Sequence, residues 1–186
     1  MHLSGICSLT AALSLLFAGS TLAQDLPTPE SLLSGAEEQG TLMSQYRDIL
    51  RNPDADIRHS AFMKLAVVED PLVRQLAYDE AFSAADASMR MLALRFSLFD
   101  RENIVVEFPG TDLPPKSYRL LERNYSNGEF LAQSGPRSPG RVQGLQVVIQ
   151  YNLCVLELVL SDDDALVGEQ ICADEKLPIK VNLRGI

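Results

Sequence analysis

The apolar residues of this chain change their spacing once, and that change constrains the fold more than any other feature. Up to about Arg101 they recur every three or four positions, as on one face of an α-helix. From Asn103 onward they alternate with polar residues, as on a half-buried β-strand. The sequence therefore predicts an α+β protein with its helices first and its strands last.

Four apolar stripes predict about four helices in the first half of the chain. The stripes occupy residues 43–50, 57–68, 72–77 and 89–99. The breaks between them contain residues that are typical of turns and helix caps. Asn52-Pro53-Asp54 interrupts the first pair, and Asp70-Pro71 supplies an N-cap acid followed by a proline at the first helical position.

These helices repeat with a period of 32 residues. The shift superimposes several positions, among them Asp54 on Asp86, Arg58 on Arg90 and Ala61 on Ala93. A period between 20 and 50 residues is typical of stacked helical hairpins. An unrelated pair of hairpins is the alternative. On physical grounds, the two aspartates can cap helices, the alanines permit close helix approach, and Arg58 and Arg90 can reach turn acids of the next unit.

The segments NPDADIRHSAFMKLA and SAADASMRMLALRFS resemble the second-helix region of HEAT-type repeats, over about residues 43–101. In that family an Asp ends the inter-helix turn and an Arg follows about four residues later. The resemblance implies a stack of helical hairpins. Such stacks need about three units to bury a continuous core, and only two are visible here. We therefore expect the helical part to be capped or to pack on another element.

Alternating residues predict about seven strands after Asn103, in a small antiparallel sandwich or open barrel. They occupy residues 103–108, 118–125, 129–134, 145–149, 154–160, 166–172 and 179–183. Segment 118–125 suits a strand better than a short helix, which remains the alternative. Ser126-Asn127-Gly128 follows it as a hairpin signal. GPRSPG, at 135–140, is predicted to be a loop.

The segment CVLELVLSDDDALVGEQIC predicts its own strand register. In a hairpin centred on Asp163, the numbers of facing residues sum to 326. This pairs Leu160 with Leu166, Leu158 with Gly168, Leu156 with Gln170, and Cys154 with Cys172. Directly opposite residues at a non-hydrogen-bonded position have Cα atoms about 4.5 Å apart, within reach of a disulfide. A slip of one residue would separate the cysteines, so the register predicts a Cys154–Cys172 disulfide.

A redox or metal-binding role for these two cysteines is the alternative to a structural disulfide. A redox pair usually has C-x-x-C spacing, whereas Cys154 and Cys172 are 18 residues apart. A zinc site needs further soft ligands, and beyond residue 23 the chain offers only His59. The spacing therefore favours a structural disulfide, and we expect no cofactor.

The same register concentrates acids at one hairpin. Glu157 faces Glu169, and Asp162-Asp163-Asp164 forms the turn. Calcium takes several oxygen ligands, so Asp162, Asp164, Glu157 and Glu169 are candidate ligands. No D-x-[DN]-x-[DN]-G loop is present, which favours a solvated acidic tip without metal. A locally basic stretch contrasts with this tip and makes the surface bipolar; it contains Arg119, Arg123, Arg137 and Arg141.

The first 23 residues read as a secretory signal peptide. Their apolar stretch, residues 6–18, is too short for a bilayer, which needs about 20 residues. Thr21 and Ala23 fit a cleavage site before Gln24, with an uncleaved anchor as the alternative. We divide the chain into signal peptide (1–23), leader and linker (24–41), HEAT-like helical domain (42–102) and antiparallel β domain (103–186). The signal and the even number of remaining cysteines predict a periplasmic or secreted protein with no membrane span after cleavage.

The net charge and the absence of several motifs argue against some classes of partner and enzyme. The formal net charge of −9 argues against a nucleic acid partner. The chain contains no phosphate-binding glycine loop, H-E-x-x-H or G-x-S-x-G motif, and a Ser-His-Asp triad would have to use His59, expected to be an ordinary surface or boundary residue. We expect a non-enzymatic interaction or scaffold module that binds another protein of the periplasm or envelope. A glycan or cell-wall ligand-binding module is the alternative, followed by a small hydrolase with paired carboxylates.

Overall fold

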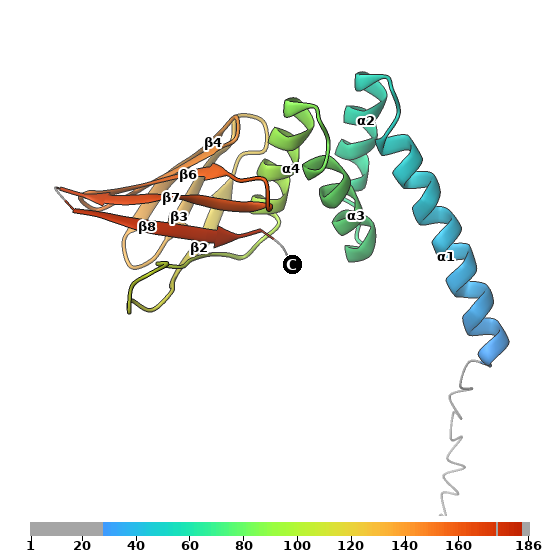
Figure 1. The fold of residues 1–186 in the computed structure, drawn as a ribbon, viewed down its shortest axis with the longest axis horizontal. Coiled ribbons are helices and arrows are strands. Elements are labelled where there is room, and N and C mark those ends of the chain that lie inside the picture. Colours follow the sequence, from blue (N-terminus) through green and yellow to red (C-terminus); the bar gives the residue numbers. More distant parts are fainter. Residues whose placement is uncertain (1–27, 174, 184–186) are drawn as a thin grey trace, which may run out of the picture.

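The structure is a computed structural model that describes residues 28–173 and 175–183. Helices lie at one end of the molecule and a curled β-sheet lies at the other (Figure 1). This arrangement confirms the α+β class and the order of helices before strands. The predicted signal peptide, residues 1–23, lies outside the described residues.

The described chain contains four α-helices. They are α1 (Pro29–Leu50), α2 (Ala55–Leu65), α3 (Pro71–Phe82) and α4 (Ala87–Phe99). The aspartates that precede α2, α3 and α4 cap them, since each side chain accepts hydrogen bonds from backbone N–H groups of the first turn; they are Asp54, Asp70 and Asp86. Helix α1 begins at Pro29 after the N-cap Thr28, so it includes residues that the sequence division gave to the leader and linker.

Eight strands follow, one more than the sequence predicts. They are β1 (Asn103–Val106), β2 (Lys116–Arg123), β3 (Glu129–Gln133), β4 (Arg137–Gln143), β5 (Gln146–Tyr151), β6 (Cys154–Leu160), β7 (Ala165–Cys172) and β8 (Glu175–Asn182). Each strand pairs antiparallel with the next in a single sheet, in sequence order. Strand β2 confirms the strand reading of segment 118–125, and a register shift between Leu120 and Glu122 bends it.

The additional strand is β4, and it corrects the prediction of a loop at GPRSPG. Pro139 faces Leu131 of β3, while the β4–β5 ladder starts one residue later, at Gly140 and Ile149. The Val142 N–H donates toward the β3 side, to the Gly128 oxygen at 2.8 Å. Backbone N–H groups of a strand point alternately to its two neighbours, so the missing N–H of Pro139 would point toward β5. The β4–β5 ladder does not include Pro139, so no ladder hydrogen bond is lost there.

Gly140 has a packing role in the same strand. A Cβ atom at this position would lie 2.2 Å from Cζ of Phe130. Glycine therefore leaves room for the ring of Phe130 beside β4. GPRSPG has the composition of a loop, but it forms part of a strand because it pairs with β3 and β5 and packs beside the Phe130 ring.

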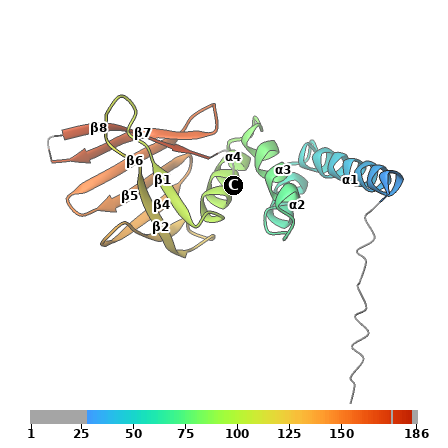
Figure 2. The ribbon, with the colours of Figure 1, turned by 90° about the horizontal axis from the view of Figure 1, so that it is seen from below.

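The sheet curls until its first and last strands meet (Figure 2). Glu107 and Lys180 exchange two backbone hydrogen bonds, of 2.8 and 3.0 Å, and join the ends of the meander. The result is a nearly closed barrel, the open-barrel form of the predicted fold. Its interior is apolar, with fully buried side chains such as Ile104, Ile149 and Leu158.

Helix α4 joins the helices to the barrel. The ring of Phe99 lies 5.2 Å from Tyr125 and 5.7 Å from Phe130, measured between centroids. The Arg95 guanidinium donates to the backbone oxygens of Tyr125 and Ser126 at 3.0 and 3.1 Å. The barrel therefore covers one end of the helical stack, as the small number of repeats led us to expect.

Candidate functional site

The β6–β7 hairpin has the register that the sequence predicts. Cys154 faces Cys172, and Leu158 faces Gly168. The two cysteines form a disulfide with a Cα–Cα distance of 4.2 Å. This bond ties the two strands together at the end opposite their turn.

The acidic residues of this hairpin do not gather into a metal site. Glu157 and Glu169 face each other, but the Lys176 Nζ lies 2.9 Å from Glu169 Oε2. Asp162 is directed at the helices, where its Oδ1 lies 3.5 Å from Arg90 Nη2, and Asp164 takes a left-handed backbone with φ of 55°. Within residues 28–173 and 175–183, no group of three His, Cys, Asp or Glu side chains is placed to hold a metal ion.

Asp86, Ser88 and His59 meet at the start of α4. Ser88 Oγ lies 2.7 Å from both Asp86 Oδ1 and His59 Nε2. A hydroxyl has one proton, and its donation to the carboxylate makes Ser88 an acceptor toward the His59 ring. This hydrogen bond, together with the one from the Ser88 N–H, lowers the pKa of Asp86 to about 2. Asp86 therefore caps α4, and half-buried His59 of α2 contacts this cap through Ser88.

A ladder of arginines connects the helical units. Arg58 Nη2 lies 3.1 Å from Asp86 Oδ2, and the same guanidinium donates to two carbonyls of the preceding loop. Arg74 repeats this pattern with Asp100 and with the loop before α3. The 32-residue comparison missed Arg74, because the Asp-x-x-x-Arg unit recurs every 16 residues rather than every 32.

Arg90 is the third member of this ladder, and its acid comes from the barrel. The partner is Asp162, at the tip of the β6–β7 hairpin. Arg90 was expected to reach a turn acid of a following helical unit, and no helix follows α4 in the described chain. The hairpin tip therefore supplies the acid that pairs with the last arginine of the ladder.

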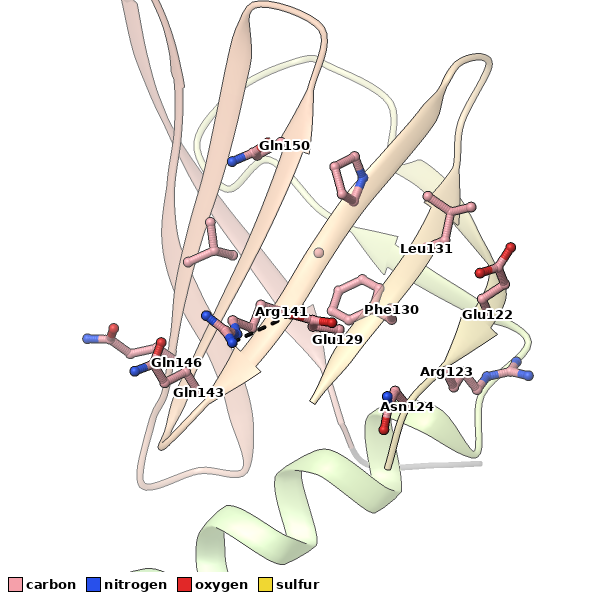
Figure 3. Close-up of a pocket in the computed structure, with 13 residues that line it drawn as sticks. Glu122, Arg123, Asn124, Glu129, Phe130, Leu131, Arg141, Gln143, Gln146 and Gln150 are labelled. Carbon is pink, nitrogen blue, oxygen red and sulfur yellow. Dashed lines mark ion pairs between the residues drawn. The ribbon is translucent and has the colours of Figure 1, made fainter. Parts of the chain in front are cut away.

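An open groove of about 700 Å³ crosses the outer face of β2, β3, β4 and β5 (Figure 3). Its apolar floor includes Leu131, Pro139 and Val148. Polar side chains surround this floor; they are Glu122, Arg123, Asn124, Glu129, Arg141, Gln143, Gln146 and Gln150. The sequence analysis did not single out this set, although outward-facing glutamines in QGLQVVIQ were a readable signal.

The strand register sets the order of the groove residues. Glu129 faces Arg141, and Gln143 faces Gln146. Arg141 Nη2 lies 3.5 Å from Glu129 Oε1, and the amide of Asn127 donates to Glu129 Oε2 at 2.8 Å. Of the four arginines in the predicted basic stretch, Arg141 is thus paired within the groove.

Two further members of that basic stretch also have partners. Arg119 lies 3.5 Å from Glu102, and Arg123 donates to the Arg101 backbone oxygen at 2.7 Å. These contacts hold the side chains against neighbouring elements. Three of the four arginines of the basic stretch, Arg119, Arg123 and Arg141, therefore contact separate local partners.

A cation–aromatic cluster lies on the interior side of the barrel. Lys116 Nζ lies 3.4 Å from the ring centroid of Tyr151 and 5.3 Å from that of Tyr118. Burial raises the pKa of Tyr118 to about 12, so its phenol stays protonated at neutral pH. The cluster packs this part of the interior with rings and an alkyl chain.

Large apolar side chains are exposed at the other end of the molecule. The open helical surface, as we name it, consists of Leu42 and Ile49 of α1 and Ile57 of α2. Leu42 and Ile49 lie on the side of α1 opposite the arginines that bind Glu80 of α3. Ile57 lies on the side of α2 turned away from Phe62, whose ring packs on Phe96 of α4. Nothing in the described chain covers this surface.

No described helix is both long enough and apolar enough to cross a membrane. Comparison with family models, with curated proteins and with solved structures found no match to this chain.

Proposed function

We propose that this chain is an exported, non-catalytic protein-interaction module whose HEAT-like helical stack is its docking element. The observation that carries the proposal is the open helical surface. Leu42, Ile49 and Ile57 are 42%, 43% and 46% exposed, although all three belong to regular helices. Leu42 and Ile49 share one side of α1, and exposed apolar side chains that gather on one face are typical of interaction sites. The Arg58–Asp86 and Arg74–Asp100 pairs support the likeness to a HEAT-type stack.

The partner that fits this surface is a protein helix with an apolar stripe and basic flanks. A stack of helical hairpins is extended by further helices, which bury the same kind of apolar face. Residues 29–46 carry Glu30, Glu37 and Glu38 and contain no Lys or Arg. A second copy of this chain would bring these acids against each other, so charge favours a different, basic partner.

Export is supported by the disulfide and by the predicted signal peptide. Disulfides persist in oxidising compartments such as the periplasm and the extracellular space. The intact mass of the protein recovered from the producing cell tests this part of the proposal. The expected mass is that of a chain starting at Gln24 with Cys154 and Cys172 oxidised, and a retained N-terminus or two free thiols would contradict it.

Site-specific photocrosslinking in the producing cell tests the docking surface. A crosslinking residue at Leu42 or Ile57 should yield one discrete adduct, and mass spectrometry should place the link on a basic helical segment of another protein. The same group at Gln133, on the barrel, is the matched control and should give no such adduct. Leu42→Glu should abolish the adduct formed at position 57. A link to a second copy, or no adduct, would overturn the proposal.

The groove over β2–β5 favours a second candidate function, recognition of a glycan or cell-wall ligand. The specific observation is its lining, in which eight polar side chains surround an apolar floor. This function uses a different surface from helix docking, so the two can be tested separately.

A further inference from the structure

We propose that the groove over β2–β5 binds a neutral oligosaccharide, an inference that rests on the second candidate function and names its ligand class. The first step is the charge of the site. Glu122 and Glu129 balance Arg123 and Arg141, although the whole protein carries −9. The groove is thus neutral on an acidic surface, which favours a ligand without net charge over a polyanion or a polycation.

The second step is the supply of hydrogen-bonding groups. In the part of the chain that the structure describes, the side chains of Gln143, Gln146, Gln150 and Glu122 form no hydrogen bond or ion pair with another residue. An amide offers two donors and two acceptor lone pairs in one plane, and a carboxylate offers two acceptor oxygens. Planar groups of this kind can bind two neighbouring hydroxyls of a sugar ring at once.

The third step is the fixed position of the charged groups. Glu129 is held by Arg141 and by the amide of Asn127, and Arg123 is held by the Arg101 backbone oxygen. These contacts restrain the three charged side chains beside the unengaged amides. Among these polar residues, a ligand therefore needs to order mainly the three glutamines and Glu122, which limits the entropy lost on binding.

The fourth step is the shape and pattern of the floor. Gln146, Val148 and Gln150 are successive outward residues of β5, so the Cα atoms of the two glutamines lie about 13 Å apart with an apolar position between them. Leu131 and Pro139 continue the apolar surface on β3 and β4. This alternation suits the C–H faces and hydroxyl edges of linked sugar rings.

A bound peptide fits the groove less well than a sugar chain. Extended peptides gain affinity by adding a strand to a sheet edge, where backbone N–H and C=O groups are unpaired. The groove lies on the face of four paired strands, whose backbone groups are engaged in the ladders. A ligand in the groove can therefore form hydrogen bonds with side chains but not with the backbone of these strands.

Isothermal titration calorimetry with uncharged oligosaccharides tests the inference. The probes are hexamers of N-acetylglucosamine, β-1,4-linked glucose and α-1,4-linked glucose, added to the full mature chain. We expect at least one hexamer to bind in a saturable manner. The double change Gln146→Ala with Gln150→Ala should weaken that binding about tenfold or more, through the loss of two polar contacts. Val148→Arg should also weaken it by filling the floor.

The double change Gln39→Ala with Gln45→Ala, on exposed positions of α1, is the matched control and should leave the affinity unchanged. Circular dichroism confirms that each variant is folded. If no hexamer binds at millimolar concentration, or if the groove variants bind as the native chain does, the inference is overturned. Photocrosslinking at Leu42 is independent of these results, so failure of the sugar site and failure of helix docking are distinguishable.

Discussion

The barrel and the helical stack end in different ways. In the barrel, Glu107, which directly follows β1, pairs with Lys180 of β8, so the sheet is nearly closed. In the stack one end is covered by the barrel through Phe99, whereas the end formed by α1 and α2 is uncovered within the described chain. A nearly closed sheet leaves few strand edges unpaired, but a row of hairpins always leaves a face that something else can cover.

The distribution of exposed apolar side chains follows this difference. Eight of the fourteen large hydrophobic residues that are exposed in the described chain precede residue 73, in the shorter, helical part. Apolar positions of the predicted helical stripes, such as Ile49, Ile57 and Leu72, are among them. Exposed apolar side chains are therefore denser in the helical part, which is the physical basis of the proposed docking.

The largest expected effect comes from the core of the stack. Phe62 is fully buried, and its ring lies 5.6 Å from Phe96 and 6.2 Å from Tyr78. Phe62→Ala should lower the free energy of unfolding by about 3–5 kcal/mol, measured by urea denaturation. Because α4 joins both cores, we expect one cooperative transition for helices and barrel, and two resolved transitions would contradict this. Met63→Ala, at the exposed neighbouring position, should change stability by less than about 0.5 kcal/mol.

Removal of the disulfide should act on the barrel. Cys154→Ser with Cys172→Ser opens a loop of about 19 residues, which in the chain-entropy model costs about 3 kcal/mol of stability. Urea denaturation with and without a reductant measures this. The reductant should destabilise the native chain and leave the double variant unchanged, and equal behaviour of the native chain in both conditions would rule out the bond as a stabilising element.

A smaller effect concerns the cap that links α2 to α4. The hydrogen bonds from Ser88 hold the folded pKa of Asp86 at about 2, below its ordinary value of 3.8. A lowered folded pKa means that this stabilisation is complete above about pH 4 and is lost as the pH falls from 3.8 toward 2. Ser88→Ala should raise the pKa of Asp86, as followed by NMR titration of its carboxyl group. An unchanged pKa in the variant would assign the shift to another neighbour.

The smallest expected effect concerns the ion pair between Arg90 of α4 and Asp162 at the tip of the β6–β7 hairpin. It tests whether this tip takes the place of a further helical unit. The Arg90–Asp162 pair is exposed on the Asp162 side, so Asp162→Asn should cost less than about 1 kcal/mol and the cost should fall with added salt. Asp86→Asn, within the stack, should cost more because it also removes the cap charge of α4. An equal or larger cost for Asp162→Asn would show that the barrel and the stack are coupled more tightly than two successive helical units.

Local sequence patterns predicted the structural features whose interacting residues lie close together in the sequence. The β6–β7 register followed from the cysteine spacing and the turn, and the caps Asp54, Asp70 and Asp86 followed from their places before apolar stripes. The candidate groove was not predicted, because its residues come from several strands and gather only when the register and curvature of the sheet are known. The Cys154–Cys172 disulfide could be predicted because both cysteines belong to one hairpin.

The sequence alone determined the change from helix to strand, the hairpin with its disulfide, and the aspartate caps, because each depends on residues within a few turns or one hairpin of each other. Tertiary structure decided the rest. GPRSPG became β4 because Leu131 and Phe130 lie beside it, the meander closed because Glu107 reached Lys180, and Arg90 found its acid in the barrel. These contacts join residues far apart in the chain, and only the packed fold sets which of them meet.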